Sequence, residues 1–144
     1  AIDKYMYVAV SKRNDNQIVL HAADLNQNHQ NSLDAPLQPS SSGWPNYVLG
    51  VIHDLLAAGY SIAGFNMLIT GNIPIGAGVS SSAALECATV FACKHLFDLD
   101  ISKQAMVKIF LTVIAFEETN YNIIISTIGL SPLNDISYKP IDLN

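Results

Sequence analysis

The residues best suited to chemistry lie in a stretch of glycines and serines at residues 71–84. Gly76 and Gly78 are separated by one residue, and a serine triplet follows at 80–82. Glycine permits positive φ and close approach of a ligand to the backbone, and a turn that opens a helix directs unpaired N–H groups at one point, where the helix dipole favours negative charge. Serine hydroxyls add donors and a ligand for a hard cation such as Mg²⁺. The stretch therefore predicts a phosphate site.

The same residues also fit a plain helix start with a serine N-cap, because glycine-rich turns of that kind are common. The stretch lacks the Gly-Lys-[Ser/Thr] of a P-loop, since no lysine or arginine occurs between Arg13 and Lys94. It also lacks the third glycine of the Rossmann fingerprint, where Ser81 stands. The charge of a bound phosphate must therefore be met by the backbone, the helix dipole, a metal ion or a distant basic side chain.

Two predicted elements flank the stretch and must position it. An apolar run at 61–70 predicts a strand that leads into it, and residues 80–97 predict a helix that leads out. That helix is apolar around most of its circumference, so we expect it to be buried centrally, with its alanines packed close to a sheet. Glu86 within it is interpreted as a helix-surface carboxylate near the favourable end of the dipole, in preference to an acid near a bound metal.

Upstream of these elements, the pattern predicts a β-hairpin and a long loop. Apolar residues alternate at 2–11 and 17–22 on either side of the turn signal at 14–16, which is typical of two paired strands. Residues 24–43 are rich in Asn, Gln, Ser, Pro and Asp with little periodicity, and they predict a surface loop. His29 in that loop is expected to be solvated and not to contact a substrate.

Two further helices are predicted from the spacing of apolar residues. Residues 44–56 repeat apolar side chains at i, i+3, i+4 and i+7, and Gly59 ends this helix. Ser102 is a suitable N-cap for a third helix. Near the end of that helix stand Glu117 and Glu118, where negative charge is unfavourable unless it is paired or used.

Composition restricts the class of protein. The chain has 144 residues, half of them apolar and 13% charged, which suits one folded domain. A net charge of −5 and a pI near 5.1 disfavour a nucleic-acid surface, and we expect neither a membrane span nor a secretory signal.

Cys87 and Cys93 fall on different faces of one predicted helix, so two unpaired thiols and a reducing, cytoplasmic compartment are expected. Because the chain starts with alanine inside a predicted strand, we expect a processed or incomplete polypeptide.

The glycine–serine stretch resembles the central nucleotide-binding motif of the GHMP kinases, and within that superfamily the chain most resembles the galactokinases. The likeness runs from residue 1 to about residue 110. It implies an α+β fold, the amino-terminal GHMP kinase domain of ribosomal-protein-S5-domain-2-like type, in which a mixed sheet packs with helices. The carboxy-terminal GHMP domain would be absent from residues 1–144, which would form part of the amino-terminal domain. The segments that carry the likeness are Ala1-Ile2-Asp3-Lys4, Trp44-Pro45-Asn46-Tyr47-Val48-Leu49-Gly50-Val51, Pro74-Ile75-Gly76-Ala77-Gly78-Val79-Ser80-Ser81-Ser82-Ala83-Ala84 and Ala84-Leu85-Glu86.

The resemblance implies a sugar kinase that transfers the γ-phosphate of ATP to the C1 hydroxyl of galactose, with ATP and Mg²⁺ as cofactors. Positioning, metal and electrostatics do most of the work in such transfers. By the same resemblance, Ser82 would also bind Mg²⁺, and Trp44 and Tyr47 would lie near the adenine. The implied ATP-binding residues are Gly76, Ala77, Gly78, Val79, Ser80, Ser81, Ser82 and Trp44.

Three parts of the family pattern are absent or displaced. The first motif, with a transition-state arginine and the residues that read the sugar, would precede Ala1, and the third motif belongs to the carboxy-terminal domain. Glu117 and Glu118 are the candidates for the carboxylate that completes the Mg²⁺ site, about a turn later than expected. The place of the catalytic aspartate reads Ile128-Gly129-Leu130-Ser131 without an acid, and Asp135 is the nearest candidate.

Three functions therefore stay open. The chain is part of a sugar kinase and inactive alone, or it is a truncated or diverged relative that binds nucleotide or a partner without turnover. In the third, the glycine–serine turn is structural in an interaction module that binds no nucleotide. The acceptor also stays open among galactose, another sugar and a mevalonate-type alcohol.

Overall fold

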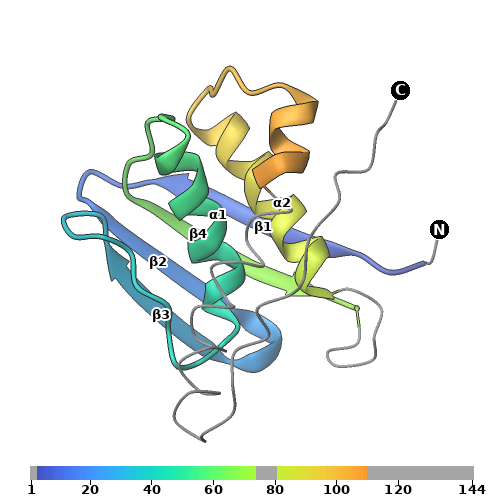
Figure 1. Cartoon of the computed structure of the whole chain (residues 1–144). Helices are drawn as coiled ribbons and strands as arrows, with labels where there is room; N and C mark the ends of the chain where they lie inside the picture. Colours follow the sequence, from blue (N-terminus) through green and yellow to red (C-terminus); the bar gives the residue numbers. More distant parts are fainter. Residues whose placement is uncertain (1–2, 74–80, 110–144) are drawn as a thin grey trace, which may run out of the picture.

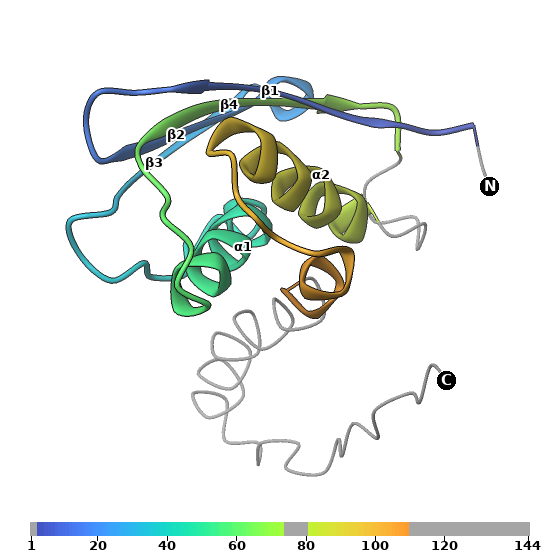
Figure 2. The same ribbon diagram turned by 90° about the horizontal axis from the view of Figure 1, so that it is seen from above.

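The computed structural model describes residues 3–73 and 81–109. A four-stranded sheet carries two long helices on one face, as Figure 1 shows from the front and Figure 2 from above. A further helical segment at 103–109 follows the second helix. This arrangement confirms the predicted α+β class with a mixed sheet packed against helices. The elements in chain order are β1 (Met6–Lys12), β2 (Gln17–Ala22), the 3-10 helix η1 (Ala23–Leu25), β3 (Gln27–Ser32), α1 (Pro45–Ala57), β4 (Phe65–Gly71) and α2 (Ser81–Leu96).

The strand order corrects the predicted hairpin. Both strands exist, but the order across the sheet is β1-β4-β2-β3, so β4 lies between β1 and β2. β4 runs antiparallel to β1 and parallel to β2, with Val8 opposite Ile69 and Leu20 opposite Met67. β4 inserts because its alternate apolar residues share the core face of both neighbours, a long-range match that local turn signals do not contain.

The turn between β1 and β2 explains how β4 reaches this central position. The Arg13 backbone N–H donates to the Gly64 carbonyl at 2.9 Å, and its guanidinium donates to both Asp15 carboxylate oxygens and to Asn66 Oδ1. A side chain on Gly64 would stand 1.9 Å from the Asp15 carbonyl oxygen. The turn and the start of β4 therefore touch backbone to backbone, which only glycine allows at residue 64.

The predicted loop at 24–43 is wrong for its first part. After η1, Asn26 adopts a left-handed φ of 49°, and Gln27–Ser32 forms β3, which pairs antiparallel with β2. β3 was not predicted because it is an edge strand of polar residues without apolar alternation. Backbone hydrogen bonds to β2 hold it in place. His29 on β3 is half-buried instead of solvated; burial lowers its pKa, and its Nε2 finds no hydrogen-bond partner among the described residues.

The core fills the space between the sheet and the two helices. β2 alternates as predicted, with Ile18, Leu20 and Ala22 buried. On β1, Met6, Val8 and Val10 are half-buried, whereas Tyr7 on the other side is 57% exposed. The largest fully buried side chains come from β2, β4, α1, α2 and the residues after α2, and they are Ile18, Leu20, Phe65, Met67, Val48, Leu49, Val51, Ile52, Leu55, Val90 and Ile101.

Helix α1 agrees closely with its prediction. Pro45 occupies its first turn, and Gly59 follows its end with a φ of +86°. Asn46 is buried, and its side-chain amide donates to the Ser40 carbonyl at 3.0 Å while its Oδ1 accepts from the Ser40 N–H at 2.6 Å. This pair of bonds ties the preceding loop to the helix. Leu56, expected on the apolar face, is 39% exposed.

Helix α2 covers the predicted range but is not buried on all sides. Leu85, Val90 and Cys93 face the core, whereas Cys87 and Phe91 are exposed, the phenyl ring by 56%. The apolar residues around its circumference therefore serve two surfaces, the core and an outward groove that includes Phe91. Ser102 caps the following segment as predicted, since its Oγ accepts the Ala105 N–H at 3.1 Å. The alanines expected close to the sheet, Ala83, Ala84 and Ala88, are half-buried.

Candidate functional site

The described parts of the glycine–serine stretch lie at the end of β4 and at the start of α2 (Figure 1). Ser81 and Ser82 are half-buried in the first turn of α2. That turn contains no acidic residue, and the last turn contains Lys94 and His95, which suits the helix dipole. The first turn of α2 therefore contains no carboxylate that would oppose the positive end of the helix dipole.

The entry to the stretch is fixed by hydrogen bonds from both sides. On one side, the Asp24 carboxylate accepts from the Thr70 hydroxyl at 2.9 Å and from the Gly71 N–H at 2.7 Å. On the other side, the Tyr5 N–H donates to Asn72 Oδ1 at 2.7 Å, and the Asn72 N–H donates to the Tyr5 carbonyl at 3.1 Å. Residues 70–72 are therefore held by two separate parts of the chain where the stretch begins.

Glu86 is not the surface carboxylate that the sequence suggested. It is only 6% exposed, in the second turn of α2, and it has an interaction partner. Glu86 follows Ser82 by four residues, so the two side chains share one side of the helix. The sequence did contain a sign of this burial, because a helix that is apolar on nearly every side leaves little room for an exposed carboxylate.

Trp44 and Tyr47 lie at the start of α1 and are both half-buried. Each packs against the hydrophobic core, so part of each ring has a structural role. Their place near an adenine stays a prediction.

Of the three predicted metal ligands, Ser82 alone lies within the residues that the structure describes. Within residues 3–73 and 81–109, no group of three His, Cys, Asp or Glu side chains is arranged to hold a metal ion. The other candidates, Glu117 and Glu118 for metal and Asp135 for catalysis, lie outside the described residues, as does the segment from Gly76 to Ser80.

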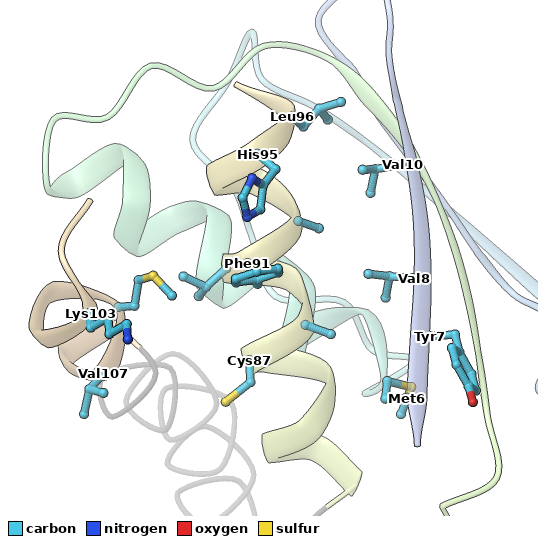
Figure 3. A pocket seen from close by; sticks show the side chains of 14 residues that line it. Met6, Tyr7, Val8, Val10, Cys87, Phe91, His95, Leu96, Lys103 and Val107 are labelled. Carbon is cyan, nitrogen blue, oxygen red and sulfur yellow. The ribbon is translucent and has the colours of Figure 1, made fainter. Parts of the chain in front are cut away.

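A separate groove of about 1060 Å³ lies along the outer face of α2 (Figure 3). β1 forms one wall with Met6, Val8 and Val10, and the helical segment at 103–109 lies on the other side of α2 (Figure 3). The floor includes Phe91, and its lining does not include Ser81 or Ser82. Sequence reasoning missed this groove because it assigned the whole apolar surface of α2 to the core.

The two cysteines of α2 differ in their surroundings. Cys87 borders the groove, and burial together with the charge of Glu86 raises the pKa of its thiol. Cys93 lies in the core, where burial raises its pKa to about 12. Both thiols are unpaired, as predicted, and neither has the lowered pKa of a reactive nucleophile.

Comparison with known proteins decides the family. The sequence profile of the GHMP kinases N terminal domain matches residues 46–122, just over half of the chain. The chain belongs to the GHMP kinase family. This match includes α1, β4, the glycine–serine stretch and α2, which are the elements that the predicted phosphate site requires.

Among the GHMP kinases, the chain is similar to galactokinases in both sequence and structure. It is 38% identical over 112 residues to a galactokinase of Staphylococcus carnosus (strain TM300), covering 76% of this chain and 29% of the relative. It is 41% identical over 101 residues to a galactokinase of Roseiflexus sp. (strain RS-1), covering 70% and 26%. The structure of Lactococcus lactis galactokinase complexed with galactose superposes with a TM-score of 0.73 at 31% identity, covering 83% of this chain and 31% of that chain.

The chain therefore spans between a quarter and a third of the length of the galactokinases that it matches. Its fold is that of the GHMP kinase amino-terminal domain, as the sequence predicted. None of the helices in the described part of the chain is long and apolar enough to cross a membrane.

Proposed function

We propose that this chain supplies the ATP phosphate loop of a galactokinase-like sugar kinase. The observation that carries the proposal is identity of 38% and 41% to galactokinases over more than 100 residues each, in alignments that cover at least 70% of the chain. The reaction is transfer of the γ-phosphate of ATP to the C1 hydroxyl of galactose. ATP, Mg²⁺ and galactose belong to the proposal, as do the roles of the individual loop residues.

The geometry around α2 supports phosphate binding. The first turn of α2 offers backbone N–H groups and the hydroxyls of Ser81 and Ser82, without a carboxylate in that turn to repel an anion. No lysine or arginine occurs between Arg13 and Lys94, so neutral donors and the helix dipole must hold most of the phosphate charge. This donor set fits a nucleotide that arrives with its own metal ion.

Ser82 is the described residue that fits a magnesium site. Its hydroxyl oxygen is a hard, neutral ligand, which suits an ion that keeps several waters and binds mainly to phosphate oxygens. When bound, Mg²⁺ would neutralise charge on the transferring phosphoryl group. Glu117 and Glu118 stay the candidates for a completing carboxylate.

In the proposed transfer, the C1 hydroxyl oxygen forms a bond to the γ-phosphorus while the bond from that phosphorus to the bridging oxygen breaks. ADP leaves with the electron pair, and the hydroxyl proton passes to a base. Asp135 is the candidate for that base. The loop residues from Gly76 to Ser82 would contribute by orienting the phosphates in line with the acceptor.

Because the chain alone is expected to be inactive, the experiment is a phosphoryl-transfer assay of the complete kinase that the proposal implies, with radiolabelled Mg·ATP and two matched acceptors, galactose and 1-deoxygalactose, which lacks the C1 hydroxyl. Label transferred to galactose alone supports the proposal. Equal transfer to both acceptors contradicts attack by the C1 hydroxyl, and a panel including mevalonate then identifies the acceptor.

A second candidate is a GHMP-like module that binds nucleotide without turnover. The observation in its favour is that Ile128-Gly129-Leu130-Ser131 carries no acid where the family resemblance calls for one. This candidate predicts saturable Mg·ATP binding, measured by calorimetry, with no label transferred to any acceptor. Absence of both binding and transfer would reject both candidates in favour of a purely structural turn.

A further inference from the structure

The carboxyl ends of β2 and β4 lie side by side because the two strands are parallel neighbours, with Ala22 opposite Ile69. η1 follows β2 directly and carries Asp24, while Thr70 and Gly71 complete β4. Asp24 is thus brought to the place where the chain leaves the sheet for the glycine–serine stretch. Sequence reasoning gave it no role, since it stood at the edge of a predicted loop.

Asp24 uses both carboxylate oxygens on this exit. Oδ1 accepts from the Thr70 hydroxyl at 2.9 Å, and Oδ2 accepts from the Gly71 N–H at 2.7 Å. Hydrogen bonds to an ionised acceptor are stronger than those between neutral groups. The opposite edge of β4 is held by the reciprocal bonds between Tyr5 and Asn72. Without Asp24, the exit would be attached on one side only.

We propose that Asp24 is a positioning residue for the phosphate loop, which fixes the direction in which the chain leaves β4. This inference rests on the proposed function, because it concerns the same loop. A simpler possibility is that Asp24 is only an exposed negative charge close to an anion site. These two roles predict opposite changes in the affinity for Mg·ATP. Removal of a mere charge would strengthen binding of Mg·ATP, whereas removal of a positioning contact would weaken it.

The test uses the full chain with Asp24→Asn, Asp24→Ala and Thr70→Val. Asn keeps one acceptor oxygen, Ala keeps none, and Val removes the Thr70 donor without changing charge. The control is Asp34→Asn. Asp34 is also exposed and also accepts two hydrogen bonds, in its case both from side chains, those of Asn16 and Ser32, but at the far end of β3. It therefore matches the change in charge and in hydrogen bonding without touching the exit of β4.

Two readouts are measured, the dissociation constant for Mg·ATP by calorimetry and amide hydrogen exchange across residues 71–82. We expect Asp24→Asn to raise the dissociation constant about fivefold and Asp24→Ala about tenfold or more, the range of one to two lost hydrogen bonds. Thr70→Val falls between wild type and Asp24→Ala. Exchange at Gly71 and through the stretch becomes faster in all three variants and stays at the wild-type rate in Asp34→Asn.

Tighter binding in Asp24→Asn, or the same change in the Asp34→Asn control, overturns the inference. Failure of the proposed function has a different signature, since the wild-type chain then shows no Mg·ATP binding at all. In that case hydrogen exchange still decides the structural half of the inference: faster exchange at 71–82 in the Asp24 variants only supports positioning by Asp24, and unchanged exchange refutes it.

Discussion

Gly71, at the end of β4, lies so close to Tyr5 and Met6 that it has no room for a side chain, which makes Gly71→Ala an informative change. A Cβ on Gly71 would lie 2.6 Å from the Tyr5 carbonyl oxygen, against about 3.4 Å for an ordinary contact, so the two backbones must separate by about 0.8 Å. Both sides are backbone and cannot rotate away. The same movement lengthens the two bonds between Tyr5 and Asn72.

Two opposing effects set the change in the free energy of unfolding that Gly71→Ala should cause. Overpacking of this kind costs about 1–3 kcal/mol, and replacing glycine by alanine returns about 0.4–1 kcal/mol by restricting the unfolded chain. The middles of these two ranges differ by about 1.3 kcal/mol, and we expect Gly71→Ala to lower the free energy of unfolding by about that amount. Urea unfolding followed through the fluorescence of Trp44, the single tryptophan, measures this loss.

The control for Gly71→Ala is Gly59→Ala. A Cβ there meets nothing within 4 Å, but its φ of +86° is unfavourable for alanine. The control is therefore destabilised by about 1–2 kcal/mol, at a site remote from the loop. Only Gly71→Ala should also weaken Mg·ATP binding. If Gly71→Ala unfolds like wild type, or if both variants bind Mg·ATP equally well, the description of a closely fitted loop entry is refuted.

Three further predictions concern the rest of the chain. Gly64→Ala should destabilise more than Gly71→Ala, because its Cβ would stand 1.9 Å from a backbone oxygen; urea midpoints of the two variants compare them directly. The Arg13 side chain hydrogen-bonds the Asp15 carboxylate and lowers the pKa of Asp15 to about 2, so its stabilisation is fully present above the ordinary value of 3.8 and is lost as pH falls towards 2. Stability curves of wild type and Asp15→Asn should accordingly converge on acidification, and a constant difference would contradict the ion pair. A thiol reagent should modify one cysteine, Cys87, in the folded chain and both in urea; modification of Cys93 without unfolding would contradict its buried position.

Much of the fold could be predicted because its signals are local. Helix α1 follows from apolar spacing and from Gly59 at its end, and β2 follows from strict alternation. The glycine–serine stretch has a distinctive composition, so its place between a strand and a helix could be predicted from the sequence. The family resemblance then assigned that local pattern to a known domain.

The parts that escaped prediction depend on contacts between distant residues. The position of β4 between β1 and β2 depends on pairs such as Ile18 with Phe65, which are far apart along the chain. β3 is stabilised by backbone pairing along polar residues, which leaves no apolar pattern to read. The burial of Glu86 and the exposure of Phe91 depend on what packs against each side of α2, and a helical pattern alone does not contain this information.

In the candidate site, too, some residues could be predicted from local sequence and others depend on contacts between distant residues. Composition predicted donors around Gly78 and Ser82, but it did not reveal Asp24, whose hydrogen bonds at the exit of β4 arise from the parallel pairing of β2 with β4. The sequence-predicted Trp44 and Tyr47 contribute to the core at the start of α1.

The central claim, that the glycine–serine stretch binds the phosphates of Mg·ATP, is tested most directly by the thermal midpoint of the chain with and without Mg·ATP. At about a hundredfold excess over the dissociation constant, a ligand that binds only the folded state adds about 2.7 kcal/mol, or roughly 5–10 °C for a domain of this size. We predict this rise for wild type and its loss in Gly78→Val, compared at matched ligand concentration. A Gly78→Val chain that is still protected by Mg·ATP, or a wild-type chain that is not, would contradict the claim.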